Sequence, residues 1–315
     1  MTVLFTSVRP LKRAENIKAV YDKYQGKKEF VRSGTPEGQN KIQRKKYDVV
    51  VGDELLQKCA SPFITIGHGI GGGKKYGFDQ RNTYHTKAGA ELITYAVIAS
   101  EAMVDGAAKQ LGIPKEKVLP LGFPRTDQYF GAKKGDGKTE YADSKMYLYA
   151  PTFETQTYEM TNWSSIDDML SDDETLIIKP HMVVGDLEPK EYYRHIKFVS
   201  PQEPSAPYLI DCDVCVTDYS SIMFDAYVLQ KPVVLFAKDW DFYKYKRGMY
   251  FNYPEDYSSY HARTGWAMVE ACRKAEYEPG KYDKFLGRCD GHSTERVIEV
   301  IKEFTKNGER KRSKV

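Results

Sequence analysis

The chain has 315 residues, and a usual domain size of about 150 residues predicts two domains. Hydrophobic residues make up 41% and charged residues 29%, which excludes an intrinsically disordered chain. The mean hydropathy is −0.58, and no apolar stretch approaches the ~18 residues of a membrane span. The N-terminal apolar run precedes its charges, the reverse of a secretory signal. We therefore expect a soluble, cytoplasmic protein.

The net charge of +3 comes from one end of the chain. The last fifteen residues hold six basic and two acidic groups, which leaves 41 basic against 42 acidic residues in the rest. A tail with Lys306, Arg310, Lys311, Arg312 and Lys314 could contact anionic lipid or nucleic acid. A solvated terminus is the simpler interpretation, and composition alone does not predict a nucleic-acid-binding protein.

Five cysteines, an odd number in a long chain, do not indicate a disulfide framework. Cys212 and Cys215 form a lone CxxC pair in the strand-like run LIDCDVCVTD. Strand side chains alternate between faces, so the two thiols would point to opposite sides. No second pair completes a zinc site, and we predict buried structural thiols and no metal.

Short apolar runs alternate with helical patterns along the chain. Strands are expected at Val3–Thr6, Val49–Val51, Phe63–Ile66, Tyr95–Ala99, Val118–Leu121, Met146–Ala150, Thr175–Ile178, Val214–Thr217 and Val233–Phe236. Helices are expected at Glu101–Leu111, Ser220–Leu229 and Thr294–Phe304. This alternation predicts an α/β protein with parallel sheets.

The polar, Gly/Lys-rich stretch Gly131–Ser144 divides the strands into two series and is interpreted as a linker. We expect an N-terminal α/β domain over residues 1–135, a C-terminal α/β domain over residues 136–300 and a basic tail over residues 301–315. A ligand is expected in the interdomain cleft, at the carboxyl ends of the strands.

A glycine-rich loop, Gly67–Gly77, follows the apolar run FITI and contains His68. It contains the GxGxxG pattern, but no helical apolar period follows, as a dinucleotide-binding site requires. It also fails as a Walker loop, because His68 stands where the first glycine belongs. What remains is a loop that presents His68 with Lys74 and Lys75 nearby, or a simple surface turn.

Two further segments carry candidate phosphate-binding side chains. In LIIKPH, a strand ends at Lys179 and is followed by His181. In DVCVTDYSSIMFDAYVL, a buried strand precedes a helix for which Ser220 is the expected N-cap, so the serines and the helix N-terminus could bind a diphosphate. Ordinary structural histidines and helix caps are the alternatives.

The segment Tyr243–Tyr253 is rich in aromatic and basic residues, and its Arg247 could bind a phosphate bidentately. Single-stranded nucleic acid is a weaker interpretation, because acidic residues surround the segment. In DGHSTER, Ser293 or Thr294 is expected to cap the last helix.

Six motifs, taken in chain order, resemble those of the CDP-glycerol glycerophosphotransferases, which build teichoic acids and related capsular polymers. They are LGFPRTD, YLYAPTFE, LIIKPH, DVCVTDYSSIMFDAYVLQKPVVLF, YKRGMYFNY and DGHSTERV. The resemblance extends from about His68 to Val297. It implies two Rossmann-like lobes of the glycosyltransferase-B type, no metal or cofactor, and a nucleotide held mainly by the C-terminal lobe.

The resemblance also implies residue roles. His68 corresponds to the family's proposed general base, and Lys179 and His181 to the pair proposed to steady the phosphates. The resemblance assigns donor binding to Lys179, Ser220, Ser221, Arg247, Ser293 and Thr294, and a catalytic role to His68 and His181. The chain departs from the family pattern at five places: Gly67 replaces a tryptophan, a glycine-rich insertion follows, and Phe123, Glu154 and Met182 replace the usual asparagine, arginine and proline.

The leading interpretation is therefore a transferase that moves glycerol or ribitol phosphate from a CDP-linked donor to an acceptor hydroxyl and releases CMP. The acceptor would be a polymer, a lipid-linked chain or another hydroxyl compound, and the enzyme could lie peripherally at a membrane. One alternative is a nucleotide-sugar glycosyltransferase acting on a carbohydrate or a hydroxylated DNA base. Another is a non-catalytic nucleotide-binding module.

Overall fold

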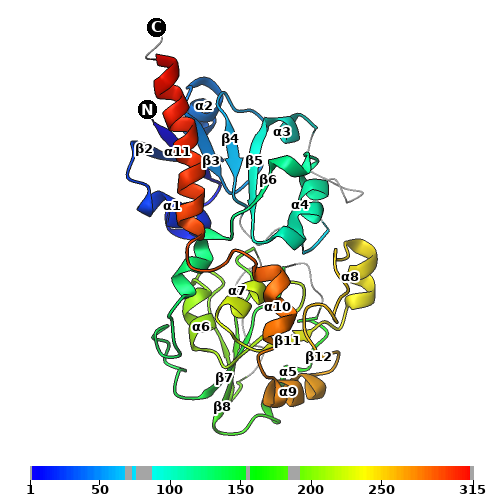
Figure 1. The fold of residues 1–315 in the computed structure, drawn as a ribbon. Coiled ribbons are helices and arrows are strands. Elements are labelled where there is room, and N and C mark those ends of the chain that lie inside the picture. The colour runs from blue at the N-terminus through cyan, green and yellow to red at the C-terminus, as the bar shows by residue number, and fades with distance from the viewer. Residues whose placement is uncertain (1, 68–72, 76–86, 154–156, 184–191, 313–315) are drawn as a thin grey trace. The chain divides into compact units, whose positions relative to one another are not determined.

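The computed structural model describes residues 2–67, 73–75, 87–153, 157–183 and 192–312 (Figure 1). The chain forms two compact units. Unit 1 contains residues 1–128 and 284–315, and unit 2 contains residues 129–283. Residues 284–300, which we expected in the C-terminal domain, therefore pack in unit 1, and the division near residue 128 precedes the expected one at residue 135.

Unit 1 contains a parallel six-stranded sheet in the order β2-β1-β3-β4-β5-β6. Its strands are β1 (Val3–Ser7), β2 (Lys28–Arg32), β3 (Val49–Gly52), β4 (Phe63–Thr65), β5 (Ile93–Ile98) and β6 (Val118–Pro120). Its helices are α1 (Glu15–Lys23), α2 (Pro36–Arg44), α3 (Lys87–Leu92), α4 (Val104–Leu111) and the C-terminal α11 (Ser293–Arg312). Much of the expected basic tail is thus the end of α11.

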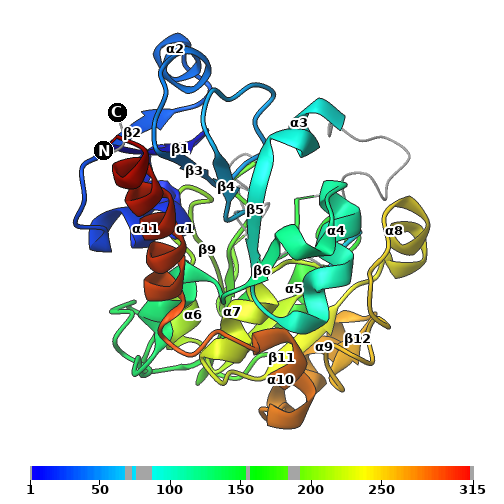
Figure 2. The same cartoon turned by 45° about the horizontal axis from the view of Figure 1, so that its top comes forward.

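The C-terminal helix belongs to the core of unit 1. Val297, Ile298 and Ile301 of α11 are buried in one apolar cluster with side chains of β1, α1 and β3. Figure 2 shows α11 lying beside α1 over this sheet. The helical spacing of the three apolar residues explains why one face of α11 is buried.

Unit 2 contains a second parallel sheet, in the order β12-β11-β10-β7-β8-β9. Its strands are β7 (Lys145–Tyr149), β8 (Glu174–Ile178), β9 (Ile196–Phe198), β10 (Val214–Thr217), β11 (Val233–Phe236) and β12 (His261–Ala262). Its helices are α5 (Trp163–Asp167), α6 (Ala206–Asp211), α7 (Ile222–Val228), α8 (Trp240–Lys246) and α9 (Gly265–Lys274), and α10 (Pro279–Leu286) crosses into unit 1.

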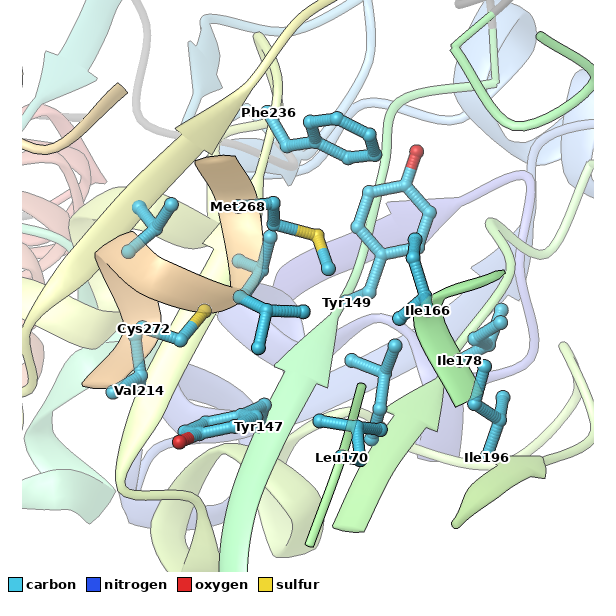
Figure 3. Packing of buried hydrophobic residues seen from close by; sticks show 14 of the residues in the cluster. Tyr147, Tyr149, Ile166, Leu170, Ile178, Ile196, Val214, Phe236, Met268 and Cys272 are labelled. Atoms are coloured by element: carbon cyan, nitrogen blue, oxygen red, sulfur yellow. The ribbon is translucent and has the colours of Figure 1, made fainter. Parts of the chain in front are cut away.

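One face of this second sheet packs against α5 and α9 (Figure 3). Tyr149 of β7 and Phe236 of β11 meet Ile166 of α5 and Met268 of α9 in the labelled cluster. Helices α6 and α7 contribute no side chain to this cluster and contact β7 and β10, respectively. Both units therefore have the predicted α/β architecture with parallel sheets.

One local expectation, about the cysteine pair, changes. Cys212 is the residue that ends α6, not part of a strand, although Cys215 does lie in β10. Both thiols are buried, as predicted, and burial raises the pKa of Cys212 to about 12.

Among the described helices, none combines the length and apolar character needed to cross a bilayer.

Candidate functional site

The strand order of unit 2 marks one edge of its sheet as the place for a ligand. From β7 the chain continues to β8 and β9 on one side, and β10, β11 and β12 then add to the other side. In open α/β sheets, ligands bind where the strand order reverses, at the carboxyl ends of the strands. Here that point lies between β7 and β10, and the predicted residues that follow β8 and β10 lie at the same edge.

Asp218, which follows β10, organises this edge. Its buried carboxylate accepts hydrogen bonds from the backbone N–H of Thr152, at 2.9 and 3.1 Å to its two oxygens. It also accepts from the N–H groups of Tyr219 and Ser220. The loops that follow β7 and β10 are therefore joined by one side chain.

This arrangement corrects the predicted helix cap. The N-cap of α7 is Ser221, not Ser220, and its side chain makes no capping hydrogen bond. Asp218 instead satisfies the N–H groups that precede the helix, so those donors are not available to an anion. In the described chain the hydroxyls of Ser220 and Ser221 have no hydrogen-bond partner, which leaves them able to bind a ligand.

Lys179 and His181 follow β8 but differ in their surroundings. The ammonium of Lys179 is buried and donates to the carbonyl oxygens of Pro180 at 3.1 Å and Pro201 at 3.2 Å. These bonds tie the end of β8 to the segment after β9. The imidazole of His181 is only partly buried, and its Nδ1 accepts a hydrogen bond from the N–H of Val183 at 3.2 Å.

Arg247 ends helix α8, and the glycine beside it has a structural reason. Gly248 has a φ of +76°, in the left-handed region that favours glycine. The N–H groups of Arg247 and Gly248 both donate to the carbonyl of Tyr243, at 2.8 and 3.1 Å. Arg247 and Gly248 therefore form a common helix C-terminal motif, in which a glycine in the left-handed conformation follows the last helical residues. Contact of the Arg247 guanidinium with a phosphate stays a prediction.

A buried aromatic cluster, which the sequence pattern does not predict, supports the same edge. The hydroxyl of Tyr219 donates to Asp239 at 2.8 Å, and its ring stacks on Tyr243 with centroids 3.6 Å apart. Burial raises the pKa of Tyr219 above its ordinary value, and the charge on Asp239 adds to the shift. Tyr243 and Tyr253 are buried, so these two rings are not available to stack on nucleic-acid bases.

In the sequence, only the alternation of aromatic and basic residues in YKYKRGMYFNY indicates this cluster. A seven-residue helix that buries Tyr243 while exposing its neighbours explains the pattern.

Ser293 and Thr294 belong to unit 1, where they begin α11. Both are buried, and their N–H groups donate to the carboxylate of Asp127 at 3.0 and 2.7 Å. Asp127, from the motif LGFPRTD, is thus the cap of α11 that the sequence assigned to Ser293 or Thr294. Their contact with the donor remains untested.

His68 and most of its glycine-rich loop lie outside the described residues, as does Glu154. The residue just before His68 is described: Gly67 has a φ of +56°, and its carbonyl accepts from the amide of Asn16 at 3.1 Å. The Asn16 oxygen in turn accepts from the N–H of Arg125 at 2.9 Å. The start of the loop is therefore fixed to unit 1, and the role of His68 stays a prediction.

Among the described residues, no group of three or more His, Cys, Asp or Glu side chains could hold a metal ion.

Comparison with known proteins identifies a family. The profile of "CDP-Glycerol:Poly(glycerophosphate) glycerophosphotransferase" matches residues 48–303. A teichoic acid poly(ribitol-phosphate) polymerase of Bacillus spizizenii is 28% identical over 264 residues, which cover 76% of this chain and 42% of the relative. A teichoic acid glycerol-phosphate primase of Bacillus subtilis is 29% identical over 214 residues, covering 63% and 56%. The chain spans about half the length of these relatives.

Solved structures share the fold. The wall teichoic acid polymerase TagF matches with a TM-score of 0.76 at 20% identity, over 98% of this chain and 90% of that chain. A UDP-GlcNAc 2-epimerase of Neisseria meningitidis matches with a TM-score of 0.58 at 12% identity, over 96% and 100%. These likenesses confirm the predicted fold of two parallel-sheet α/β lobes.

Proposed function

Because the chain belongs to the CDP-glycerol:poly(glycerophosphate) glycerophosphotransferase family, we propose that it transfers glycerol or ribitol phosphate from a CDP-linked donor to an acceptor hydroxyl. The acceptor is a polyol-phosphate polymer or a lipid-linked chain. CMP is the second product.

The observation that carries this proposal is the set of donors at the carboxyl edge of the unit 2 sheet. The hydroxyls of Ser220 and Ser221 follow β10 and are not engaged by the described chain. The imidazole of His181 follows β8, on the other side of β7. Hydroxyls and a ring N–H are suitable donors to the oxygens of a diphosphate. Arg247, in the loop after α8, adds a guanidinium to the proposed site.

The proposed reaction is a displacement at the β-phosphorus of the donor. The acceptor oxygen forms a new P–O bond while the bond from the β-phosphorus to the bridging oxygen breaks, and CMP leaves with that electron pair. The acceptor proton passes to a base, the role proposed for His68. Donors positioned for the charge of the transition state typically contribute ~3 kcal/mol each.

Product analysis tests the reaction directly. The full chain is incubated with CDP-glycerol or CDP-ribitol and a panel of polyol-phosphate acceptors, and the products are followed by ³¹P NMR. Release of CMP with a new phosphodiester supports the proposal. A parallel incubation with nucleotide sugars tests the glycosyltransferase alternative, which would be identified by release of a nucleoside diphosphate with formation of a glycoside. Binding of CDP without any turnover would identify a nucleotide-binding module.

The role of His68 has its own test. His68→Ala should lower kcat at least about 100-fold, the usual minimum for loss of a general base, and leave CDP binding nearly unchanged. His261→Ala, which alters an exposed histidine of β12, is the matched control and should retain full activity. A His68→Ala enzyme with more than a tenth of the wild-type kcat would remove His68 from this role.

We also propose that the enzyme contacts an anionic membrane surface peripherally, where a lipid-linked acceptor would be found. The support is an exposed aromatic-basic surface on unit 2, defined by Phe242 and Tyr245 of α8 together with Lys244 and Lys246. Tyr245 is 85% exposed. Aromatic and basic side chains together are typical of proteins that bind at the bilayer interface.

Sedimentation with vesicles tests this contact. The double variant Phe242→Ser, Tyr245→Ser should bind phosphatidylglycerol vesicles less than the wild type does. Phe130→Ser, at a phenylalanine of similar exposure elsewhere in unit 2, is the control and should bind normally. Equal binding by the wild type and both variants would refute a role for this surface.

A further inference from the structure

Phe153 lies beside His181 although the two residues come from different strands. β7 and β8 are neighbours, with Tyr149 paired to Ile178, so the segments after them leave the sheet side by side. Phe153 is the fourth residue after β7, and His181 is the third after β8. Their ring centroids are 5.2 Å apart at an angle of 43°. Phe153 thus packs against the imidazole that the proposed function assigns to phosphate binding.

The position of Phe153 is itself fixed. The preceding residue, Thr152, is buried, and its N–H donates to both carboxylate oxygens of Asp218. The carboxylate that follows β10 therefore holds the segment after β7, and that segment places a ring against the histidine after β8. Yet Phe153 remains 44% exposed, more than a phenylalanine needs to be if it served only the core.

A second contact sets the protonation of the ring. The N–H of Val183 donates to Nδ1 of His181, so Nδ1 carries a lone pair and the proton of the neutral ring lies on Nε2. In this tautomer the ring accepts through Nδ1 and donates through Nε2. A doubly protonated ring would lose the hydrogen bond from Val183.

We infer that Phe153 is a positioning residue for His181, which holds the neutral imidazole so that Nε2–H donates to a phosphate oxygen of the donor. This inference rests on the proposed function. The ring of Phe153 and the amide of Val183 both contact the imidazole, which reduces the rotamer freedom that phosphate binding would otherwise have to remove. His181 then acts as a hydrogen-bond donor and not as a cation.

Two variants of Phe153 distinguish loss of the ring contact with His181 from a general loss of local structure. Phe153→Ala removes the ring, and Phe153→Tyr keeps it. Loss of the aromatic pair removes the interaction energy that holds the imidazole in place. Phe153→Ala should therefore lower kcat about three- to tenfold, with a smaller change in KM. Phe153→Tyr should restore at least half of the wild-type kcat. Phe130→Ala, at a phenylalanine that is 46% exposed elsewhere in unit 2, should leave kcat unchanged.

A spectroscopic readout makes the inference independent of turnover. ¹⁵N NMR of the ring nitrogens, with His181→Gln used to assign the signals, reports the tautomer in the full chain. The wild type and Phe153→Tyr should show the Nε2–H form, and Phe153→Ala should show a mixture of both neutral tautomers. This result is expected with or without a donor.

The outcomes decide between the possibilities. An unchanged tautomer in Phe153→Ala, or a Phe153→Tyr enzyme no better than Phe153→Ala, would overturn the inference. If no CDP-linked donor is turned over by the wild type, the proposed function fails while the NMR measurement still tests the pairing of Phe153 with His181. A protonated His181 at neutral pH would overturn the assigned role as a neutral donor.

Discussion

Asp218 holds backbone N–H groups of two loops, so its charge is used within the protein and not offered to a ligand. A buried carboxylate needs such partners, because an unpaired charge in the interior is costly. Because of these bonds, neither Ser220, which the sequence predicts as the N-cap, nor Ser221 makes a capping hydrogen bond with its side chain. At the scale of single residues, Asp218 therefore has a structural role, and the hydroxyls of Ser220 and Ser221 remain available to bind a ligand.

This division of roles predicts how the serines behave when changed. Ser220→Ala with Ser221→Ala should alter the free energy of unfolding by less than about 0.5 kcal/mol, because no cap is lost. Affinity for CDP should fall at least about tenfold, since each hydrogen bond to a charged phosphate contributes ~1.5–3 kcal/mol. Denaturant titration and calorimetry with CDP measure the two effects.

Free cytidine is the control ligand, because it lacks the phosphates and should bind the double variant as it binds the wild type. A variant that loses about 1 kcal/mol of stability would mean that the serines do cap α7 after all. Equal weakening of CDP and cytidine would place the diphosphate away from the two hydroxyls.

At the scale of elements, the stretch interpreted as a linker is a loop folded around one carboxylate. Asp211, at the end of α6, is buried and accepts hydrogen bonds from the N–H groups of Gly135, Gly137 and Thr139 and from the Thr139 hydroxyl, at 2.7 to 2.9 Å. A Cβ on Gly137 would lie 2.1 Å from the carbonyl oxygen of Pro207. Gly137 therefore serves close packing in unit 2, whereas Gly135, with a φ of +96° and open space around its Cβ position, serves the left-handed backbone conformation.

This loop predicts a dependence of stability on pH. Burial alone would raise the pKa of Asp211, but the hydrogen bonds from Thr139, Gly135 and Gly137 outweigh it and lower the pKa. The carboxylate therefore stabilises the fold fully above its unfolded pKa of about 4, and this contribution is lost as the pH falls through the lower folded value. Asp211→Asn should reduce stability at pH 7 by ~2–4 kcal/mol.

Urea titrations between pH 7 and pH 3 check this prediction. The difference in unfolding free energy between the wild type and Asp211→Asn should shrink on acidification. Asp136→Asn, in the same loop but exposed, is the control and should stay within about 0.5 kcal/mol of the wild type. A difference that does not change with pH would show that charge is not what Asp211 contributes.

The elements that the sequence predicted are those with strong periodic patterns. β1, β3 and β10 are buried along their whole length and mainly apolar, a pattern typical of strands inside a parallel sheet. The pattern does not indicate β2 and β9, because each is a partly exposed edge strand that contains charged residues, and it does not indicate β12, because that strand has only two residues. Their place is set by pairing with a neighbouring strand, which a local pattern cannot show.

The same limit applies to the candidate site. His181, Ser220 and Ser221 were found because they follow recognisable strands. The buried state of Lys179 depends on the carbonyl of Pro201, and the cap of α11 depends on Asp127, 166 residues before Ser293 in the chain. Such contacts between distant segments are fixed by the tertiary structure, so a motif that resembles a binding site can serve the fold instead.

At the scale of the whole molecule, the C-terminal segment returns to complete unit 1. Val297, Ile298 and Ile301 of α11 are buried among side chains of the first sheet and α1. Full burial of such side chains contributes roughly 1.5–3 kcal/mol each, a large part of the ~5–15 kcal/mol that stabilises a typical domain. Unit 2, in contrast, is one continuous segment with its own sheet and apolar cluster.

Fragments of the chain should therefore differ in their ability to fold. Residues 129–286, which keep α10 intact, should unfold cooperatively in urea and bind CDP. Residues 1–128 alone should not unfold cooperatively, because the apolar faces of the first sheet and α1 would stay uncovered. Joining residues 287–315 to residues 1–128 through a flexible linker should restore a cooperative transition, and Ile301→Asp in that fusion should abolish it. Cooperative unfolding of residues 1–128 without α11 would mean that the helix is an addition to unit 1 and not part of its core.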